Sequence, residues 1–168
     1  DEQSQQATTT DLKIIVIGKS GTGKTSYVNR WTKKTFDENY KATIVSEYGF
    51  KIYEHEGKYY RIQLWDIAGQ DKNVKITKTF AKNSHGCIIV CDATVPETRN
   101  ESLKWKACID EDIKFLDGTN LPCILAENKV DLLPPEEENN LDSLKEFASA
   151  NNFLASFRTS AKTGYNID

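Results

Sequence analysis

The fold is decided by the stretch IIVIGKSGTGKTSYVNR at residues 14–30. Its first four residues are apolar and β-branched, as a strand covered on both faces of a parallel sheet requires. Residues 24–33 then have the pattern of a helix. Between the two, residues 18–25 fit GxxxxGK[ST], the pattern of a phosphate-binding loop, which follows a strand and opens a helix. We therefore predict that the chain binds a nucleoside triphosphate.

The residue types of this loop suit phosphate chemistry. Its glycines let backbone N–H groups turn toward an anion, and the start of the helix adds partial positive charge. Lys24 is expected to reach the β- and γ-phosphates and to act in catalysis, while the Thr25 hydroxyl ligates Mg²⁺. A glycine-rich turn with an exposed lysine is the alternative, and it leaves the flanking strand and helix unexplained. The other predicted nucleotide contacts here are Ser20, Gly21, Thr22, Gly23 and Ser26.

The composition excludes several classes of protein. With 168 residues, 38% hydrophobic and 28% charged, the chain is long enough for one α/β domain. Its net charge of −3 argues against a nucleic-acid surface, and no apolar run is long enough to span a membrane. The spacing of the four cysteines fits no zinc pattern, so we expect a reducing, cytosolic compartment. They are Cys87, Cys91, Cys108 and Cys123.

Strand and helix patterns alternate along the chain. Residues 46–65 differ, because two alternating stretches joined by HEGK predict an antiparallel hairpin. The predicted fold is an α/β, three-layer α/β/α P-loop NTPase with a mostly parallel six-stranded sheet and one antiparallel edge hairpin. The other expected strands are 12–17, 87–91, 122–127 and 153–157, and the expected helices are 24–33, 75–83, 98–115 and 141–151.

The two ends of the chain carry separate expectations. Residues 1–10 are polar and are predicted to be a disordered lead-in, with one domain over residues 11–168. A sheet layered in this way should end with one more helix covering it, whereas the sequence stops soon after the strand at 153–157. We therefore expect that the chain is trimmed before or at its last helix.

The motif LWDIAGQD at residues 64–71 supplies candidates for metal binding and catalysis. Asp66 ends an apolar strand, where an acid can hold Mg²⁺ through water. The Gly69 N–H can approach the γ-phosphate, and Gln70 stands where GTPases keep the residue that orients the attacking water. An aspartate at a strand end is also common in turns, but its spacing to Gly69 and Gln70 favours the site.

Two further loops predict guanine as the base. ENKVD at residues 127–131 follows a buried strand, so its side chains emerge where open α/β sheets bind ligands. Asp131 can accept from the N1–H and 2-amino groups of guanine, with Asn128 bracing the loop and the Lys129 stem along the base. In TSAKT at residues 159–163, the Ala161 N–H is expected to meet the guanine O6. Its supporting residues are Ser160 and Lys162.

With these motifs, residues 11–168 resemble the Ras-like small GTPases, and within them the Rab branch. YKATI at residues 40–44 is similar to the first Rab switch. The resemblance implies that the Thr43 hydroxyl is a second Mg²⁺ ligand, that Phe36 covers the guanine ring and that Tyr40 contacts the nucleotide. It also implies an aromatic effector surface, for which sheet and helix packing is the alternative. That surface comprises Tyr48, Trp65 and Phe80. Ile67 and LKWK at residues 103–106 resemble the Rab branch tied to lysosome-related organelles.

The resemblance implies a molecular switch of vesicle trafficking that binds and slowly hydrolyses GTP. Exchange factors, a GTPase-activating protein and effectors are expected partners of a monomer that binds no nucleic acid. A prenylated tail absent from this sequence would hold it on the cytosolic face of an intracellular membrane. The sequence departs from the Rab pattern at two places, the polar segment at residues 71–86 and Glu127, where glycine or alanine is common. These departures bear on the identity of the partners more than on the chemistry.

A phosphate-binding loop is also compatible with two other functions. A small-molecule phosphotransferase needs an acceptor pocket and an arginine-rich lid, for which the sequence offers no signal. A module that binds guanine nucleotide without hydrolysing it typically lacks the catalytic glutamine or the loop glycines, and here Gly21, Gly69 and Gln70 are all present. The hydrolytic switch is therefore preferred.

Overall fold

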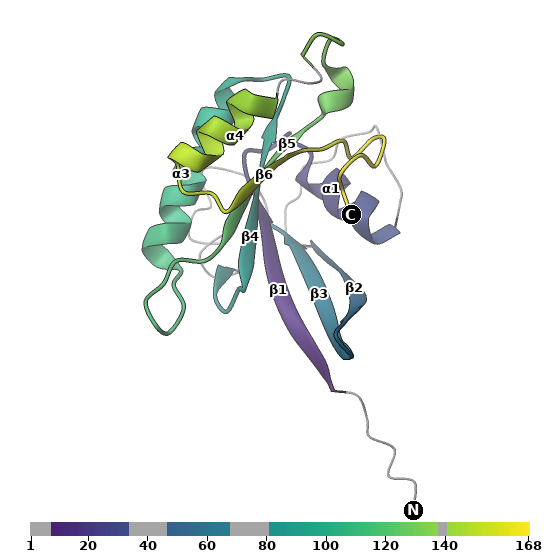
Figure 1. The fold of residues 1–168 in the computed structure, drawn as a ribbon, viewed down its shortest axis with the longest axis vertical. Coiled ribbons are helices and arrows are strands. Elements are labelled where there is room, and N and C mark those ends of the chain that lie inside the picture. Colours follow the sequence, from purple (N-terminus) through teal and green to yellow (C-terminus); the bar gives the residue numbers. More distant parts are fainter. Residues whose placement is uncertain (1–7, 34–46, 68–80, 138–140) are drawn as a thin grey trace, which may run out of the picture.

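The computed structural model describes residues 8–33, 47–67, 81–137 and 141–168, apart from the side chains of residues 47 and 48. Its six-stranded sheet has the order β2-β3-β1-β4-β5-β6 (Figure 1). The strands are β1 (Thr9–Ile17), β2 (Glu47–His55), β3 (Lys58–Asp66), β4 (Gly86–Asp92), β5 (Cys123–Asn128) and β6 (Ala155–Arg158). The helices are α1 (Lys24–Lys33), α3 (Glu97–Asp112), α4 (Leu141–Ala150) and a 3₁₀ helix, η2 (Val130–Leu132).

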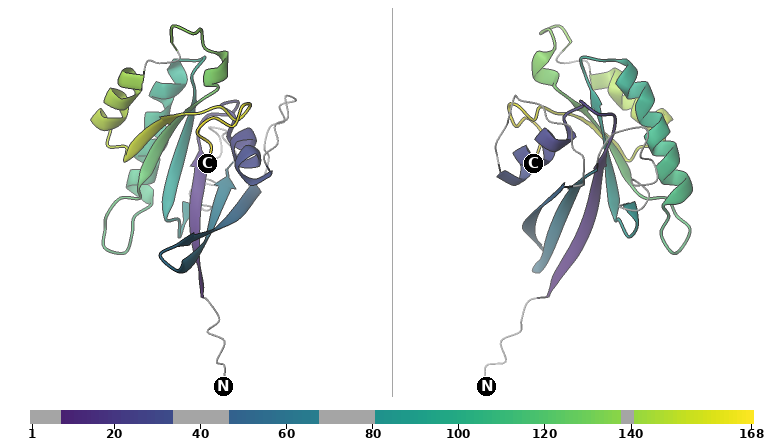
Figure 2. Two further views of the ribbon diagram at one scale, coloured as in Figure 1. Left: turned by 45° about the vertical axis from the view of Figure 1, so that its right-hand side comes forward. Right: turned by 180° about the vertical axis from the view of Figure 1, so that it is seen from behind.

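The predicted fold class is confirmed. Every strand pair is parallel except β2 with β3, which form the predicted antiparallel hairpin at one edge. Helices α3 and α4 lie on one face of the sheet and α1 lies on the other, which makes three layers (Figure 2). Because the strands β1, β4, β5 and β6 run parallel, their carboxyl ends meet at one edge.

Three element boundaries differ from the prediction by two or more residues. Strand β1 begins at Thr9, inside the segment predicted to be disordered, because it pairs with the long hairpin strand β3. Helix α3 ends at Asp112 rather than at residue 115, since Ile113 adopts an extended conformation and is buried. Strand β6 starts at Ala155 because Phe153 packs into the core. The helix predicted at residues 75–83 falls mainly outside the described residues.

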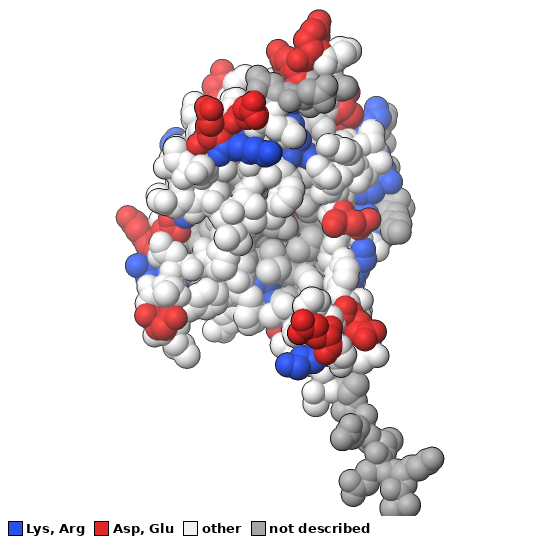
Figure 3. All heavy atoms as spheres, viewed as in Figure 1, with Lys and Arg blue, Asp and Glu red and all other residues white. Residues whose placement is uncertain are grey.

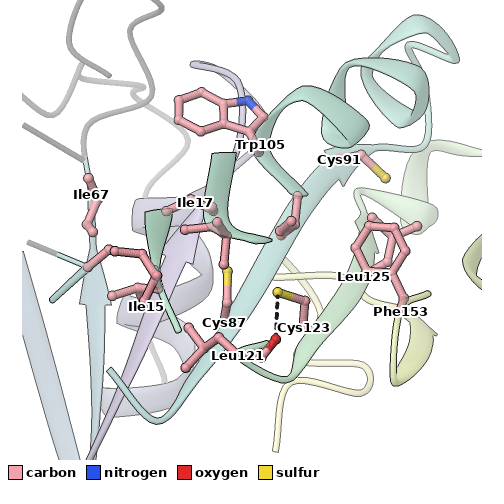
Figure 4. Close-up of a cluster of buried hydrophobic side chains, with 14 of the residues drawn as sticks. Ile15, Ile17, Ile67, Cys87, Cys91, Trp105, Leu121, Cys123, Leu125 and Phe153 are labelled. Atoms are coloured by element: carbon pink, nitrogen blue, oxygen red, sulfur yellow. Dashed lines mark hydrogen bonds between the residues drawn. The ribbon is translucent and has the colours of Figure 1, made fainter. Parts of the chain in front are cut away.

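One core lies between the sheet and helices α3 and α4 (Figure 4). Alternate residues of the central strands point to this side, as the period of two in a strand requires, so Ile15, Ile17, Cys87 and Leu125 all meet here. Trp105 of α3 is also part of this cluster. Among the described residues, no group of three or more His, Cys, Asp or Glu side chains is placed to hold a metal ion.

The described residues cover the opposite face of the sheet only in part. Tyr27 and Trp31 of α1 pack on Val16, Leu64 and Val90. Beside them runs an open apolar trough of about 470 Å³, whose lining includes Ile14, Ile62, Ile88 and Ile124. Figure 3 shows the molecule from the same side as Figure 1. Its charged side chains lie mostly around the rim of the picture, and the middle is largely uncharged. The further helix expected to cover the sheet stays a prediction.

No helix in the described part of the chain combines the length and the apolar character needed to cross a membrane.

Candidate nucleotide site

The predicted site residues that the structure describes lie at the carboxyl edge of the sheet. The glycine loop follows β1, Asp66 is the last residue of β3, and Asn128 is the last residue of β5. The TSAKT loop follows β6. Segments that are more than 100 residues apart in the chain therefore lie at one edge, where open α/β sheets bind ligands.

Close packing explains two glycines of the phosphate loop. A Cβ atom on Gly18 would lie 2.3 Å from the backbone oxygen of Val90, and one on Gly23 would lie 2.4 Å from Asn128 Nδ2. Both glycines also have a positive φ, which side-chain-bearing residues rarely adopt. The loop is thus pressed against β4 and β5, and a larger residue at either position would push it away from the sheet.

The Lys24 ammonium is held over this loop. Its side chain is 5% exposed, and Nζ donates a hydrogen bond to the Lys19 carbonyl at 3.0 Å. Burial lowers the pKa of Lys24 to about 8, although the negative charge of Asp66 opposes this shift. A buried ammonium with a lowered pKa gains from a nearby anion, so the site favours a phosphate group.

Thr25 and Asp66 form an oxygen pair beside the lysine. The Thr25 hydroxyl donates a hydrogen bond to Asp66 Oδ2, and Asp66 is completely buried. Hydroxyl and carboxylate oxygens are the ligands that Mg²⁺ prefers in proteins. The donor set therefore suits Mg²⁺, which these two residues could hold directly or through water.

Asn128 joins the phosphate loop to both base loops. Its Nδ2 donates to the Thr22 carbonyl at 3.1 Å. Its Oδ1 accepts from the Ala161 backbone N–H at 3.1 Å and from the Thr159 hydroxyl at 3.2 Å. Asn128 itself is 1% exposed, so these bonds form away from competing water.

Lys129 and Asp131 complete this junction. Lys129 has a φ of 67°, which turns the chain sharply after β5, and its Nζ donates to the Gly21 carbonyl at 2.7 Å. The same ammonium lies 2.9 Å from Asp92 Oδ2. The Lys129 side chain thus reaches from the base loop to the phosphate loop. The Asp131 carboxylate accepts a hydrogen bond from the Ser160 hydroxyl at 2.7 Å.

Three contributors to this arrangement were not predicted. Asp92 ends the buried strand β4, which is the same signal that singled out Asp66, and it could have been found in that way. Thr159 carries no signal beyond its place in TSAKT. Arg30 donates from Nε to the Ala161 carbonyl at 2.7 Å and from Nη2 to the Lys162 carbonyl, so it ties α1 to the second base loop.

Several predicted site residues lie outside the described residues: Phe36, Tyr40, Thr43, Gly69, Gln70 and Phe80, together with the side chain of Tyr48. Of the predicted effector surface, only the Trp65 side chain is described. It packs against the core of α3 and α4, and its Nε1 donates to Gln63 Oε1 at 2.9 Å. Trp65 therefore packs against the core, and its part in an effector surface stays a prediction.

A glycine loop between β1 and α1, with a buried lysine and a threonine–aspartate pair at its mouth, is the arrangement of a P-loop NTPase. The family comparison gives the closer assignment. The model of the Ras family matches residues 13–168, and the chain belongs to this family.

Curated relatives place the chain among the Rab proteins. It is 32% identical over 158 residues to Ras-related protein Rab-7L1 of Rattus norvegicus, covering 94% of this chain and 76% of the relative. It is 34% identical over 161 residues to Ras-related protein Rab-32 of Mus musculus, covering 94% and 70%. With Rab-32C of Dictyostelium discoideum the identity is 41% over 157 residues, covering 92% and 68%.

These findings confirm the predicted class. The protein is a GTPase of the Rab type, a switch that binds and hydrolyses GTP in membrane trafficking.

Proposed function

We propose that the described residues form one guanine-nucleotide site in which the phosphate and base subsites are held as a unit. The observation that carries this proposal is the set of hydrogen bonds from Asn128 to Thr22, Thr159 and Ala161. These bonds hold the loop for the phosphates and the loops for the base at a fixed separation. A nucleotide spanning both subsites would then meet groups that are already in place, which lowers the cost of binding.

At the phosphate end, the buried ammonium of Lys24 is proposed to bind the phosphates. In the proposed complex its ammonium lies against the β- and γ-phosphates, whose negative charge compensates for its burial. The backbone N–H groups at the start of α1 add further positive potential. Lys24 is also proposed to stabilise the negative charge that shifts between phosphate oxygens during hydrolysis.

Thr25 and Asp66 are the proposed holders of Mg²⁺, and Thr43 is proposed as a further ligand. When bound, Mg²⁺ neutralises phosphate charge and fixes the orientation of the phosphate oxygens. The Thr25 hydroxyl is proposed to be a direct ligand, in which case its bond to Asp66 orients it. Asp66 is proposed to act through water.

At the base end, Asp131 is proposed to accept from the N1–H and 2-amino groups of guanine. The hydrogen bond from Ser160 fixes the carboxylate for this role. Lys129, held by Gly21 and Asp92, is proposed to lie along the base. The Ala161 N–H, which donates to Asn128 Oδ1 in the absence of nucleotide, is proposed to turn to O6 when guanine binds. Adenine has no donor at N1, so this site would select against it.

For the hydrolysis step, Gln70 is proposed to orient the attacking water and the Gly69 N–H to bind the γ-phosphate. The arginines of the chain are engaged by other groups. Arg30 binds the carbonyls of the second base loop, Arg61 pairs with Asp11, and Arg99 and Arg158 pair with Glu127. We therefore propose a slow intrinsic rate, on the order of 10⁻⁴ to 10⁻³ per second, that an activating protein raises.

The partners and the cellular site are also proposed by analogy with the Rab type. Exchange factors, an activating protein and effectors would act on a monomer bound to the cytosolic face of an intracellular membrane. The similarity to Rab-32 and Rab-7L1 supports a place in the Rab branch tied to lysosome-related organelles. The proposed effector surface comprises Tyr48, Trp65 and Phe80.

The first test is the identity of the nucleotide carried by the purified protein. The protein is denatured by heat, and the released nucleotide is separated by chromatography and quantified. We expect GDP or GTP at about one molecule per chain, because nucleotides held at both ends dissociate slowly. Adenine nucleotide in its place would contradict the assignment of Asp131 and return the kinase reading to consideration.

A further inference from the structure

Two buried charged side chains, Glu127 and Arg158, meet the partly exposed Arg99 behind the two base loops. Glu127 is 3% exposed and Arg158 is 6% exposed. Arg99 donates from Nε to Glu127 Oε2 at 2.9 Å, and its Nη2 donates to the same oxygen. Arg158 Nη2 lies 3.3 Å from the other carboxylate oxygen, Oε1. A single glutamate therefore pairs with two arginines, one through each of its oxygens.

The pair of Glu127 and Arg158 stands where both base loops leave the sheet. Glu127 immediately precedes Asn128, and Arg158 immediately precedes Thr159. The two residues face each other as the last Cα partners of β5 and β6. The Thr159 N–H also donates to the Glu127 carbonyl at 2.8 Å. Any shift of one strand end against the other would therefore strain both the ion pair and this backbone hydrogen bond.

Further contacts connect this cluster to the helices. Arg99 lies in α3, and its Nη1 donates to the Ser143 hydroxyl of α4 at 2.9 Å. The Arg99 guanidinium also lies 5.9 Å from the ring centre of Phe147 in α4. Arg158 Nη1 donates to the Glu137 carbonyl. The strand ends behind the base loops are thus connected to α3, to α4 and to the loop at Glu137.

Glu127 occupies a position where the fold calls for an apolar side chain. Its register partner in β4 is Cys91, which belongs to the core of α3 and α4. A buried carboxylate carries a large desolvation cost, and pairing it with arginines often stabilises a fold no more than an apolar side chain would. The ion cluster instead fixes the relative orientation of its side chains, because a carboxylate between two guanidinium groups has a narrow range of favourable geometries.

We propose that Glu127 is a positioning residue for guanine recognition. Through Arg158 and Arg99 it fixes the first base loop, which carries Asp131, relative to the second, which carries Ser160 and Ala161. This inference rests on the proposed function, in which Asp131 accepts from the 2-amino group of the base. Loss of the Glu127 charge would let the two loops shift apart, and the hydrogen bond to the 2-amino group would weaken more than the phosphate contacts.

The test compares GDP with inosine diphosphate, which lacks the 2-amino group. The ratio of their dissociation constants measures how well Asp131 is placed, while contacts to the phosphates cancel. In Glu127→Gln the side chain keeps its size and loses its charge. We expect its preference for GDP over inosine diphosphate to fall by roughly tenfold. The matched control is Asp11→Asn, which makes the same carboxylate-to-amide change in an exposed pair with Arg61.

The outcomes separate this inference from the proposed function. A lower melting temperature with an unchanged preference would show that the cluster is only structural, and would overturn the inference. A wild-type protein with no preference for GDP over inosine diphosphate would instead overturn the role of Asp131, and the inference with it. If Glu127→Gln does not fold, Arg99→Gln gives the same readout, because Arg99 is partly exposed and its loss is milder. In that variant too, an unchanged preference overturns the inference.

Discussion

The Ser160 hydroxyl donates a hydrogen bond to Asp131 Oδ1 across 2.7 Å, and this contact joins the two base loops at the residue proposed to read guanine. An ionised carboxylate offers about four lone-pair positions, so one bond from Ser160 orients Asp131 and leaves capacity for the two donors of the base. The contact also shows how residues 29 positions apart in the chain make one recognition unit.

The first prediction is a change of base preference in Asp131→Asn. An amide offers a donor where the carboxylate accepted, so it suits xanthine, which carries a carbonyl at C2 in place of the amino group. We expect the affinity for GDP to fall by roughly 100-fold and xanthosine diphosphate to bind more tightly than GDP. Displacement of a fluorescent nucleotide measures both. Asp142→Asn, an exposed change in α4, should leave both affinities unaltered, and an unchanged GDP affinity in Asp131→Asn would refute the role.

The second prediction concerns the pH dependence of Lys24. Its pKa in the nucleotide-free fold is about 8, and the main cause is burial. In the unfolded chain a lysine titrates near 10.4, so the unfolded state binds more protons between these values. The burial cost, about 3 kcal/mol at neutral pH, therefore disappears as pH rises from 8 to above 10, and the free energy of unfolding of the nucleotide-free protein increases.

Nucleotide binding should show the opposite trend. Phosphates stabilise the charged form of Lys24, so binding above pH 8 requires uptake of a proton. We expect the dissociation constant for GDP to rise by about tenfold between pH 7 and pH 9. Titration calorimetry at several pH values measures it. Lys24→Gln should bind weakly and show no such dependence, and a parallel pH profile in the two proteins would assign the effect to another group.

Helix α1 shows where sequence reasoning works well. It runs from Lys24 to Lys33, as predicted, because a motif that fixes its start is followed by an apolar face at helical spacing. The end of α3 was missed, since apolar residues continue to Phe115 while the chain turns away at Ile113. Periodicity cannot distinguish a helical residue from an extended one that is buried in the same core.

The site residues also fall into two groups, those that sequence motifs predict and those that only the fold reveals. Lys24, Thr25 and Asp131 lie in short contiguous motifs, and the sequence was enough to single them out. Arg30 was not found, because its partner Ala161 lies 131 residues further along the chain. The pairing of Glu127 with Arg158 likewise depends on β5 and β6 being neighbours in register, which only the folded sheet reveals.

The third prediction tests the proposed Mg²⁺ ligand. Thr25→Asn removes the hydroxyl that donates to Asp66, and its larger amide crowds the same space. We expect the affinity for GTP with Mg²⁺ to fall at least about tenfold more than the affinity for GDP, since a bound Mg²⁺ would offset the additional negative charge of the γ-phosphate. Affinities measured with Mg²⁺ and with a chelator separate the two effects. Ser149→Asn, at an exposed position in α4, is the control, and equal losses for GTP and GDP would argue against the assignment.

The last prediction tests the catalytic role of Gln70. A leucine at this position cannot orient water, but it removes no group proposed to bind the nucleotide. We therefore expect Gln70→Leu to bind GTP as the wild type does, while its single-turnover hydrolysis falls by roughly tenfold without an activator and by more with one. Gln63→Leu makes the same substitution in β3, where the glutamine amide accepts from Trp65 Nε1, and it should keep the intrinsic rate. If Gln70→Leu hydrolyses GTP at the wild-type rate in both conditions, the water is oriented by another group, and Gln70 has no part in the chemical step.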